Sequence, residues 1–374
     1  MNINIFNALD EFVTYCEMNK NDLTESDQLI NNLVFNIRWH LLKSPGENPV
    51  IALYRDENSS KIQVAYFSCA EVTMKKLTTM ENGTRQYEEN TDLPVYTRAY
   101  TFQALYNVSG EAFKMIIDAL FNYPVDAVLM YIYKKDYEQL KLYLEENKQY
   151  NYYASCYSDA FDGEIGHNRF DSMQLVFPNT FDEIFEPFQK KKQHRYNIRH
   201  VKRVKRIAEA QYAVRYKYIS PLSNSEADIE KVFSDVELIF KNSWQSELNF
   251  DNHQEKLTFL YDHKKLMLLV IYAEEEPVSY FYGYVENGRI LESWMAYNSN
   301  FSRYSFGLLA LVEFLQYCIN DQIQSLEFGG TTHQYKTDLV NKKEPIHEIV
   351  VFNPTATISR ELRLIKRCYP KALI

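Results

Sequence analysis

The stretch from Lys264 to Lys336 constrains the fold of this chain more than any other. Its centre holds two aromatic and β-branched runs, residues 278–285 and 290–297, which are separated by a polar turn that contains Asn287-Gly288. Asn-Gly between two such runs is the strongest short-range sign of a β-hairpin, because both residues accept the positive φ angles of a tight turn. The sequence therefore predicts two antiparallel strands at the heart of this stretch.

Further elements extend this hairpin on both sides. A dense apolar run at residues 265–272 predicts a strand buried on both faces, and a run at residues 308–319 predicts a buried helix after Gly307. A short strand is expected at residues 324–328, before Gly329-Gly330. The helix start gathers free backbone N–H groups and the positive end of the helix dipole, which suit a pyrophosphate or a carboxylate. An ordinary helix start after a turn is the alternative that the loop alone also fits.

The order and spacing of these elements resemble the C-terminal half of the CelD/BcsL-like acetyltransferases of the GNAT superfamily, close relatives of the Fem-type aminoacyl transferases. The resemblance covers about residues 185–352 and follows the order of elements rather than close identity. Four pieces carry it: an Arg-rich helix at residues 195–206, Ser243-Trp244 at the end of the next helix, Tyr304-Ser-Phe-Gly307, and Phe328-Gly-Gly followed by Tyr335-Lys336. The resemblance implies an α/β (α+β) protein with a duplicated GNAT-like fold, in which two mixed-sheet domains are flanked by helices.

The chain length supports two globular units, because 374 residues exceed the usual size of one domain. We expect an N-terminal GNAT-like domain at residues 1–180, a basic linking helix at residues 181–211 and a C-terminal acyltransferase domain at residues 212–374. The two halves show a similar order of strands and helices without a repeat at the level of residues. Duplication is therefore implied by the resemblance and by the order of elements.

Composition narrows the class of protein. A formal net charge of −9 argues against general coating of nucleic acid, and DNA is not expected as a partner, because phosphate binding depends on clustered Lys and Arg. The five cysteines are scattered without a C-x-x-C pair, which favours reduced thiols, and no metal site is expected. No run approaches about 18 apolar residues, so the sequence predicts no transmembrane segment and a cytoplasmic location.

The resemblance implies an N-acyltransferase that moves an acyl group from acyl-CoA, or another acyl thioester, to an amine of a sugar, lipid precursor or small metabolite. Such an enzyme must hold the donor, polarise its carbonyl and manage two protons. Tyr335 matches the tyrosine that protonates the leaving thiolate in many GNAT enzymes, Glu292 is a candidate general base, and His333 is a second proton-transfer candidate. The structural alternatives are packing for Tyr335 and exposed positions for Glu292 and His333. A slip of one residue in the strand would move Glu292 to the other face.

The residues expected to bind the donor are Arg303, Ser305, Phe306, Gly307 and Leu308. This loop keeps one Arg and one Gly but departs from the Gln/Arg-x-x-Gly-x-Gly/Ala spacing that is usual in acetyl-CoA-dependent members. An acyl carrier protein or an aminoacyl-tRNA therefore also fits as the donor.

Four further residues are candidates for substrate binding: Lys336, Trp244, Arg199 and Arg203. Lys336 matches the basic partner in the family's Tyr-Lys pair and would bind an acidic acceptor or a donor phosphate. The Arg-rich helix predicts an anion platform, with a solvated charged face as the alternative. Two other functions stay open, a Fem-like transferase that uses aminoacyl-tRNA and a non-catalytic GNAT-fold module in polysaccharide biosynthesis.

Overall fold

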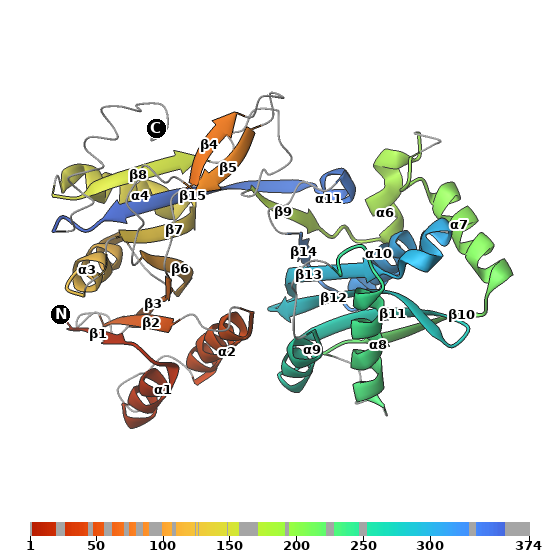
Figure 1. Cartoon of the computed structure of the whole chain (residues 1–374), viewed down its shortest axis with the longest axis horizontal. Coiled ribbons are helices and arrows are strands. Elements are labelled where there is room, and N and C mark those ends of the chain that lie inside the picture. Colours follow the sequence, from red (N-terminus) through yellow and green to blue (C-terminus); the bar gives the residue numbers. More distant parts are fainter. Residues whose placement is uncertain are drawn as a thin grey trace. The chain divides into compact units, whose positions relative to one another are not determined.

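The computed structural model divides the chain into two compact units, residues 1–170 together with 345–374 (unit 1) and residues 171–344 (unit 2). Both units combine a mixed sheet with helices, and Figure 1 labels their elements. The structure describes residues 2–19, 27–43, 48–55, 62–70, 75–79, 85–89, 99–106, 110–123, 125, 127–147, 149–156, 171–190, 194–221, 228–246, 253–328 and 334–355.

Unit 1 is built on a sheet with helices on both faces. Its strand order is β1 (Asn2–Phe6), β2 (Asn48–Arg55), β3 (Ile62–Ala70), β6 (Ala99–Tyr106), β7 (Ala127–Tyr133) and β15 (Lys342–Phe352), and β8 (Asn151–Cys156) also pairs with β15. The pairing of β6 with β7 is parallel and the other pairings are antiparallel. A separate hairpin joins β4 (Lys75–Thr79) to β5 (Arg85–Glu89).

Alternate residues of β2 explain how the helices of unit 1 are placed. Ile51 and Leu53 pack in one cluster with α1 (Leu9–Met18) and α2 (Asp27–Lys43). Val50 and Ala52 pack in another cluster with α3 (Gly110–Leu120) and α4 (Lys134–Glu146). Successive side chains of a strand point to opposite faces, so one apolar strand supplies both clusters.

Unit 2 repeats the same plan. Its strand order is β10 (Val214–Ile219), β11 (Leu266–Ala273), β12 (Glu276–Glu286), β13 (Arg289–Tyr297), β14 (Ser325–Glu327) and β9 (Asp171–Val176). Again one pairing is parallel, that of β13 with β14. The duplicated α/β fold class is therefore confirmed.

Unit 1 takes its last strand from beyond unit 2 in the sequence. β15 follows the elements of unit 2, yet it lies between β7 and β8 of unit 1. Unit 2 is continuous in sequence, since β9 begins it and pairs with its own strand β14. Unit 1 thus depends on a segment that follows the whole of unit 2.

The helices of unit 2 cover both faces of its sheet. On one face lie α8 (Ile229–Lys241) and α9 (His253–Asp262), as Figure 1 shows. On the other face α6 (Phe181–Phe185), η1 (Glu186–Phe188), α7 (Ile198–Gln211) and α10 (Phe306–Asn320) share one apolar cluster with the sheet. Every residue of β11 is buried, as its apolar run predicts.

Local signals of the sequence set the main turns of unit 2. The tight turn between β12 and β13 consists of Asn287 and Gly288, with φ angles of 50° and 72°, so the predicted hairpin is confirmed. The basic helix begins at Ile198, where the Asn197 side chain accepts a hydrogen bond from the N–H of Arg199 at 3.0 Å. α8 begins after Asp228, whose φ angle of 75° is left-handed.

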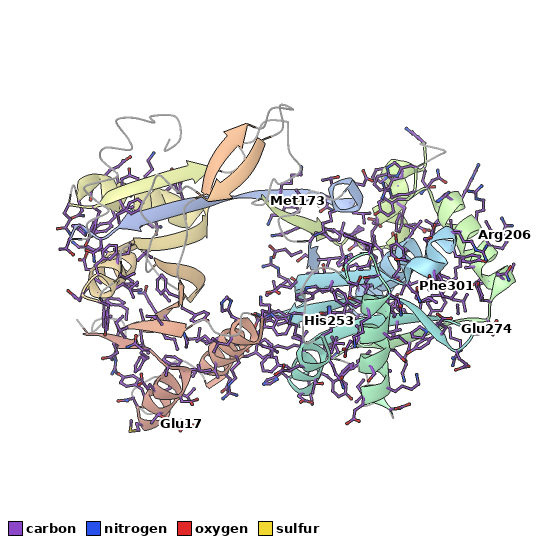
Figure 2. The ribbon with its side chains drawn as sticks, viewed as in Figure 1. Glu17, Met173, Arg206, His253, Glu274 and Phe301 are labelled. Atoms are coloured by element: carbon purple, nitrogen blue, oxygen red, sulfur yellow. The ribbon has the colours of Figure 1, made fainter. Side chains whose placement is uncertain are left out.

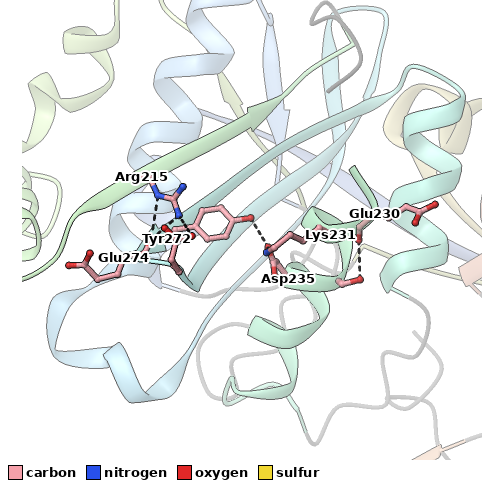
Figure 3. Close-up of polar contacts among 8 residues, drawn as sticks. Arg215, Glu230, Lys231, Asp235, Tyr272 and Glu274 are labelled. Carbon is pink, nitrogen blue, oxygen red and sulfur yellow. Dashed lines mark hydrogen bonds and ion pairs between the residues drawn. The ribbon is translucent and has the colours of Figure 1, made fainter. Parts of the chain in front are cut away.

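Polar contacts fix α8 on the sheet. The Tyr272 hydroxyl donates to Asp235 at 2.9 Å, and Lys231 Nζ donates to the same carboxylate oxygen at 2.8 Å (Figure 3). At the end of β11, the Arg215 guanidinium donates to the carbonyl of Glu274 at 3.0 Å.

In the ranges given above, no helix is long and apolar enough to cross a membrane.

Candidate functional site

The site centres on the interrupted pairing of β13 with β14. These parallel strands are paired only at Arg289 with Ser325 and at Ile290 with Leu326. β14 ends at Glu327, whereas β13 continues to Tyr297, and no described strand pairs with residues 291–297 on that side. Within the described residues, part of the β13 backbone edge thereby has no strand neighbour. Such an edge can form hydrogen bonds to an extended ligand.

A β-bulge marks the point where the strands part. Glu292 pairs with Tyr284 and Ile290 pairs with Val285, so Leu291 is the extra residue of β13. A bulge bends its strand and changes the direction of the following side chains. Opposite the bulge, a Cβ atom on Gly283 would meet the Ile290 side chain and lie 3.0 Å from the carbonyl oxygen of Glu292. Glycine at this position therefore lets β12 and the bent part of β13 approach closely.

The first turn of α10 lies against the end of β13. Ser305 begins the helix in the left-handed conformation, with φ 54°. A Cβ atom on the buried Gly307 would lie 2.9 Å from the Tyr297 ring, so a larger residue would push the helix and the strand apart. The N–H groups of this helix turn therefore lie next to the end of β13.

The predicted donor-binding residues differ in exposure. Phe306 is fully buried in the apolar cluster, whereas Ser305 and Leu308 are half-buried. Arg303 is exposed and lies over the Tyr304 ring, with 4.7 Å from the guanidinium carbon to the ring centre. A hydrogen bond with Tyr212 raises the pKa of Arg303.

Glu292 lies on the face of the sheet that α8 and α9 cover. Its partner Tyr284 and the next pair along, Tyr282 with Trp294, define this face by register. The rings of Tyr282 and Trp294 stack with centres 4.9 Å apart. Complete burial raises the pKa of Tyr282, and electrostatic interactions with Tyr280 and Glu292 raise it further. Glu292 itself is half-buried.

His253 extends this group from α9 and was not among the residues predicted from the sequence. Its Nδ1 atom lies 3.1 Å from the Tyr282 hydroxyl, while its Nε2 atom is buried without a hydrogen-bond partner in the described part of the chain. Burial lowers the pKa of His253 to about 4, and the nearby Lys256 charge contributes. The imidazole is therefore neutral at pH 7. Its place at the start of α9 carries no sequence motif that could have revealed it.

The segment after α8 contacts the open edge of β13. The Gln245 side chain donates to the carbonyl of Met295 at 3.2 Å. Its neighbour Trp244 is 56% exposed, which leaves its indole accessible to a ligand. Trp244 was predicted from the sequence, whereas Gln245 was not. The only feature of the sequence that could have indicated Gln245 is its position next to Trp244.

Lys336 lies at the end of β14, on the other side of the interruption. It belongs to α11 (Gln334–Leu339), is 9% exposed, and donates from Nζ to the carbonyl of Phe328 at 2.6 Å. Burial lowers its pKa to about 8. Tyr335 precedes it in α11, but its side chain is outside the described part of the structure, as is the whole of His333.

Arg199 and Arg203 are exposed on α7. The segment before α7 contacts α11, because His194 and Arg195 lie 3.6 Å and 3.8 Å from the Asp338 carboxylate. The structure thus ties the entry of the basic helix to the helix that carries Lys336. Among the residues it describes, no three His, Cys, Asp or Glu side chains gather as a metal site would require.

Comparison with known proteins assigns the chemistry of unit 2. Residues 192–337 match the acetyltransferase (GNAT) domain, and this range contains the interrupted strand pair, α10 and Lys336. The chain contains a GNAT-type acyltransferase domain. The bulge in β13 and the start of α10 are therefore features of that domain. Among curated protein sequences, none matches this chain.

Solved structures resemble the whole chain in fold. One is a conserved protein of unknown function from Bacteroides thetaiotaomicron VPI-5482, with a TM-score of 0.52, 10% identity, and coverage of 94% of this chain and 99% of that one. Another is FemX, with a TM-score of 0.52, 10% identity, and coverage of 86% of this chain and 91% of that one. At such low identity the likeness concerns the fold alone. It extends over both units and not only over the acyltransferase domain.

Proposed function

We propose that this protein is an N-acyltransferase that moves an acyl group from an acyl thioester, such as acyl-CoA, to the amine of a sugar, lipid precursor or small metabolite. The observation that carries the proposal is the interrupted pairing of β13 with β14, inside the part of the chain that matches the GNAT domain. The thioester arm would lie along residues 291–297, on the side of β13 where no described strand pairs with it. Backbone donors at this edge would polarise the thioester carbonyl.

The donor's phosphates would bind at the other end of the same edge. Ser305, Gly307 and Leu308 supply the first turn of α10, and a helix N-terminus favours negative charge. Arg303 is exposed just before this turn. Phe306 anchors the turn in the core and would act by holding it in place.

The proposed reaction joins the acceptor nitrogen to the acyl carbon and breaks the carbon–sulfur bond. The amine lone pair attacks the carbonyl carbon, and the thiolate leaves with the bonding electrons. Glu292 would take a proton from the amine, with His333 as a second candidate, and Tyr335 would give a proton to the thiolate. The products are an amide and a free thiol. Lys336 would bind a negatively charged group of the acceptor or the donor.

The acceptor would enter from the side of the sheet on which α8 and α9 lie, because Glu292 points to that side. Glu292 lies on that face, and Gln245 contacts the open β13 edge from the segment after α8. The exposed Trp244 stands beside Gln245 and would stack on the acceptor. An amine held there would meet both the carboxylate and the thioester.

The test is an assay of purified full-length protein with acyl-CoAs of increasing chain length and a panel of amines, in which thiol release and the mass of the amide are measured. Tyr335→Phe should lower kcat by about 10²-fold or more, the range of general acid catalysis, with little change in donor binding. Tyr216→Phe serves as a matched control, because it removes a buried hydroxyl of the same unit that has no hydrogen-bond partner in the described part of the chain. Unchanged turnover in Tyr335→Phe would refute its role. Transfer from aminoacyl-tRNA, with none from any thioester, would replace the proposed donor.

A further inference from the structure

The outer face of α7 carries a row of basic side chains. Arg199, Lys202, Arg203 and Arg206 are all exposed, and at 3.6 residues per turn they fall within an arc of about 100°. Val201, Val204 and Ala208 occupy the opposite, buried side. The row, called the basic stripe below, is about 10 Å long. Figure 2 shows Arg206 on the outer side of the helix.

The basic stripe is not neutralised within the described parts of the chain. Lys205, which projects to the side, forms an ion pair with Glu313 of α10 at 2.7 Å. None of the four stripe side chains forms such a pair with a described carboxylate. Burial lowers the pKa of His200, and the positive charge of Arg203 lowers it further. In a chain of net charge −9, this exposed row of cations is complementary in charge to an anionic partner.

An apolar residue adjoins the basic stripe. Ile207 is 49% exposed and follows Arg203 by one helical turn. Nucleic acids offer mainly phosphates to such a surface, whereas an acidic helix of a protein offers carboxylates together with apolar side chains. The combination of four cations with an exposed isoleucine therefore favours a protein partner over RNA.

The position of α7 connects the basic stripe to the donor side of the site. α7 packs on α10 through the Lys205–Glu313 pair and through the shared apolar cluster. The first turn of α10 lies at the end of the β13 edge where the thioester is proposed to bind. A partner on the basic stripe would thus be held by the helix that neighbours the donor-binding one.

We propose that the basic stripe and Ile207 dock an acidic acyl carrier protein, which delivers the acyl group as a thioester on its prosthetic thiol. The inference rests on the proposed acyl transfer and names its donor. The loop before α10 contains one glycine and departs from the usual CoA-binding spacing. A carrier protein held by α7 fits this loop, because its contacts with α7 would supply the binding energy that the nucleotide part of CoA supplies elsewhere.

The test compares two donors for one acyl group, the acyl-CoA and the acylated carrier protein, with three forms of the full-length chain. These are the wild type, the stripe variant Lys202→Glu with Arg206→Glu, and a control variant Lys190→Glu with Lys241→Glu, which has the same charge change at exposed sites off α7. We expect kcat/KM with the acyl carrier to fall at least tenfold in the stripe variant only. Transfer from acyl-CoA should stay within about twofold, since electrostatic docking acts on association.

Direct binding of the unacylated holo carrier, measured by titration calorimetry at low and at physiological salt, keeps the inference testable even if no transfer occurs. Absence of transfer with either donor would refute the proposed function, whereas loss of carrier binding in the stripe variant would still support the docking surface. Carrier binding that is equal in the stripe and control variants would overturn it. Binding of a tRNA mixture that only the stripe variant loses, without carrier binding to the wild type, would reassign the basic stripe to RNA.

Discussion

Lys336 holds its ammonium group almost out of contact with water. Burial lowers its pKa to about 8, so the folded protein binds fewer protons than the unfolded chain between pH 8 and the ordinary lysine pKa of about 10.4. The destabilisation is fully present below pH 8 and is relieved as the pH rises toward 10. A shift of this size corresponds to roughly 3 kcal/mol, an upper value because some solvent screening persists.

The substitution Lys336→Met removes the charge and keeps an unbranched side chain. The unfolding free energy of this variant minus that of the wild type should fall as the pH rises from 7.5 to 10, because only the wild type gains stability there. Urea unfolding at four pH values measures the difference. Lys241→Met, at an exposed lysine, should give a difference that does not change with pH. A flat difference for Lys336→Met would contradict its lowered pKa.

His253 should impose a pH dependence of the same sign in a more acidic window. It is 3% exposed, and its pKa of about 4 means that the unfolded chain binds more protons than the folded protein between pH 4 and the ordinary histidine pKa of about 6.5. Stability is therefore lost as the pH falls through this window. His253→Gln can still bond to the Tyr282 hydroxyl but does not titrate. Its stability relative to the wild type should rise by about 2 to 3 kcal/mol between pH 7 and pH 4.5. Denaturant curves whose separation does not change with pH would show that His253 does not titrate in this way.

At the scale of elements, the bulge in β13 depends on Gly283. A Cβ atom there would approach the Ile290 side chain and the Glu292 backbone, so Gly283→Ala should destabilise the protein by about 1 to 3 kcal/mol, the usual cost of overpacking. Gly288→Asn is the matched control in the same hairpin, because its φ of 72° suits Asn and a Cβ atom there would make only ordinary contacts with the Gln324 side chain, at 3.5 Å or more. Thermal unfolding compares the two. Equal stability would mean that β12 and β13 can separate without cost.

The sequence predicted the elements of unit 2 that local patterns determine. The hairpin at Asn287-Gly288, the buried strand β11 and the helix α10 each follow from residues close together in the chain. The face of Glu292 could not be predicted in the same way, because the extra residue Leu291 breaks the alternation of β13. His253 and Gln245 join the site only through contacts that cross the sheet and the helices, which no spacing in the sequence records.

The contribution of β15 to unit 1 is a property of the whole molecule. An apolar run such as Ile346–Phe352 indicates a strand but does not identify its neighbours, and sequence order alone favours the nearer sheet. The structure instead places β15 between β7 and β8. The sheet of unit 1 is therefore completed by a strand that follows the acyltransferase domain in the sequence. Unit 1 thus needs a segment about 190 residues away from its other strands, which makes its closure a slow, non-local step.

This arrangement predicts what a chain that ends at Asn341 will do. Without β15, the strands β7 and β8 lose their common neighbour and each exposes a row of backbone donors and acceptors. Amide exchange measured by mass spectrometry should then be at least tenfold faster in residues 127–133 and 151–156 than in the full chain. β11 and β12 keep their partners within unit 2 and should stay protected, and they serve as the internal control. If residues 127–133 keep their protection, unit 1 does not depend on β15; if β11 also loses protection, the two units fold as one cooperative body.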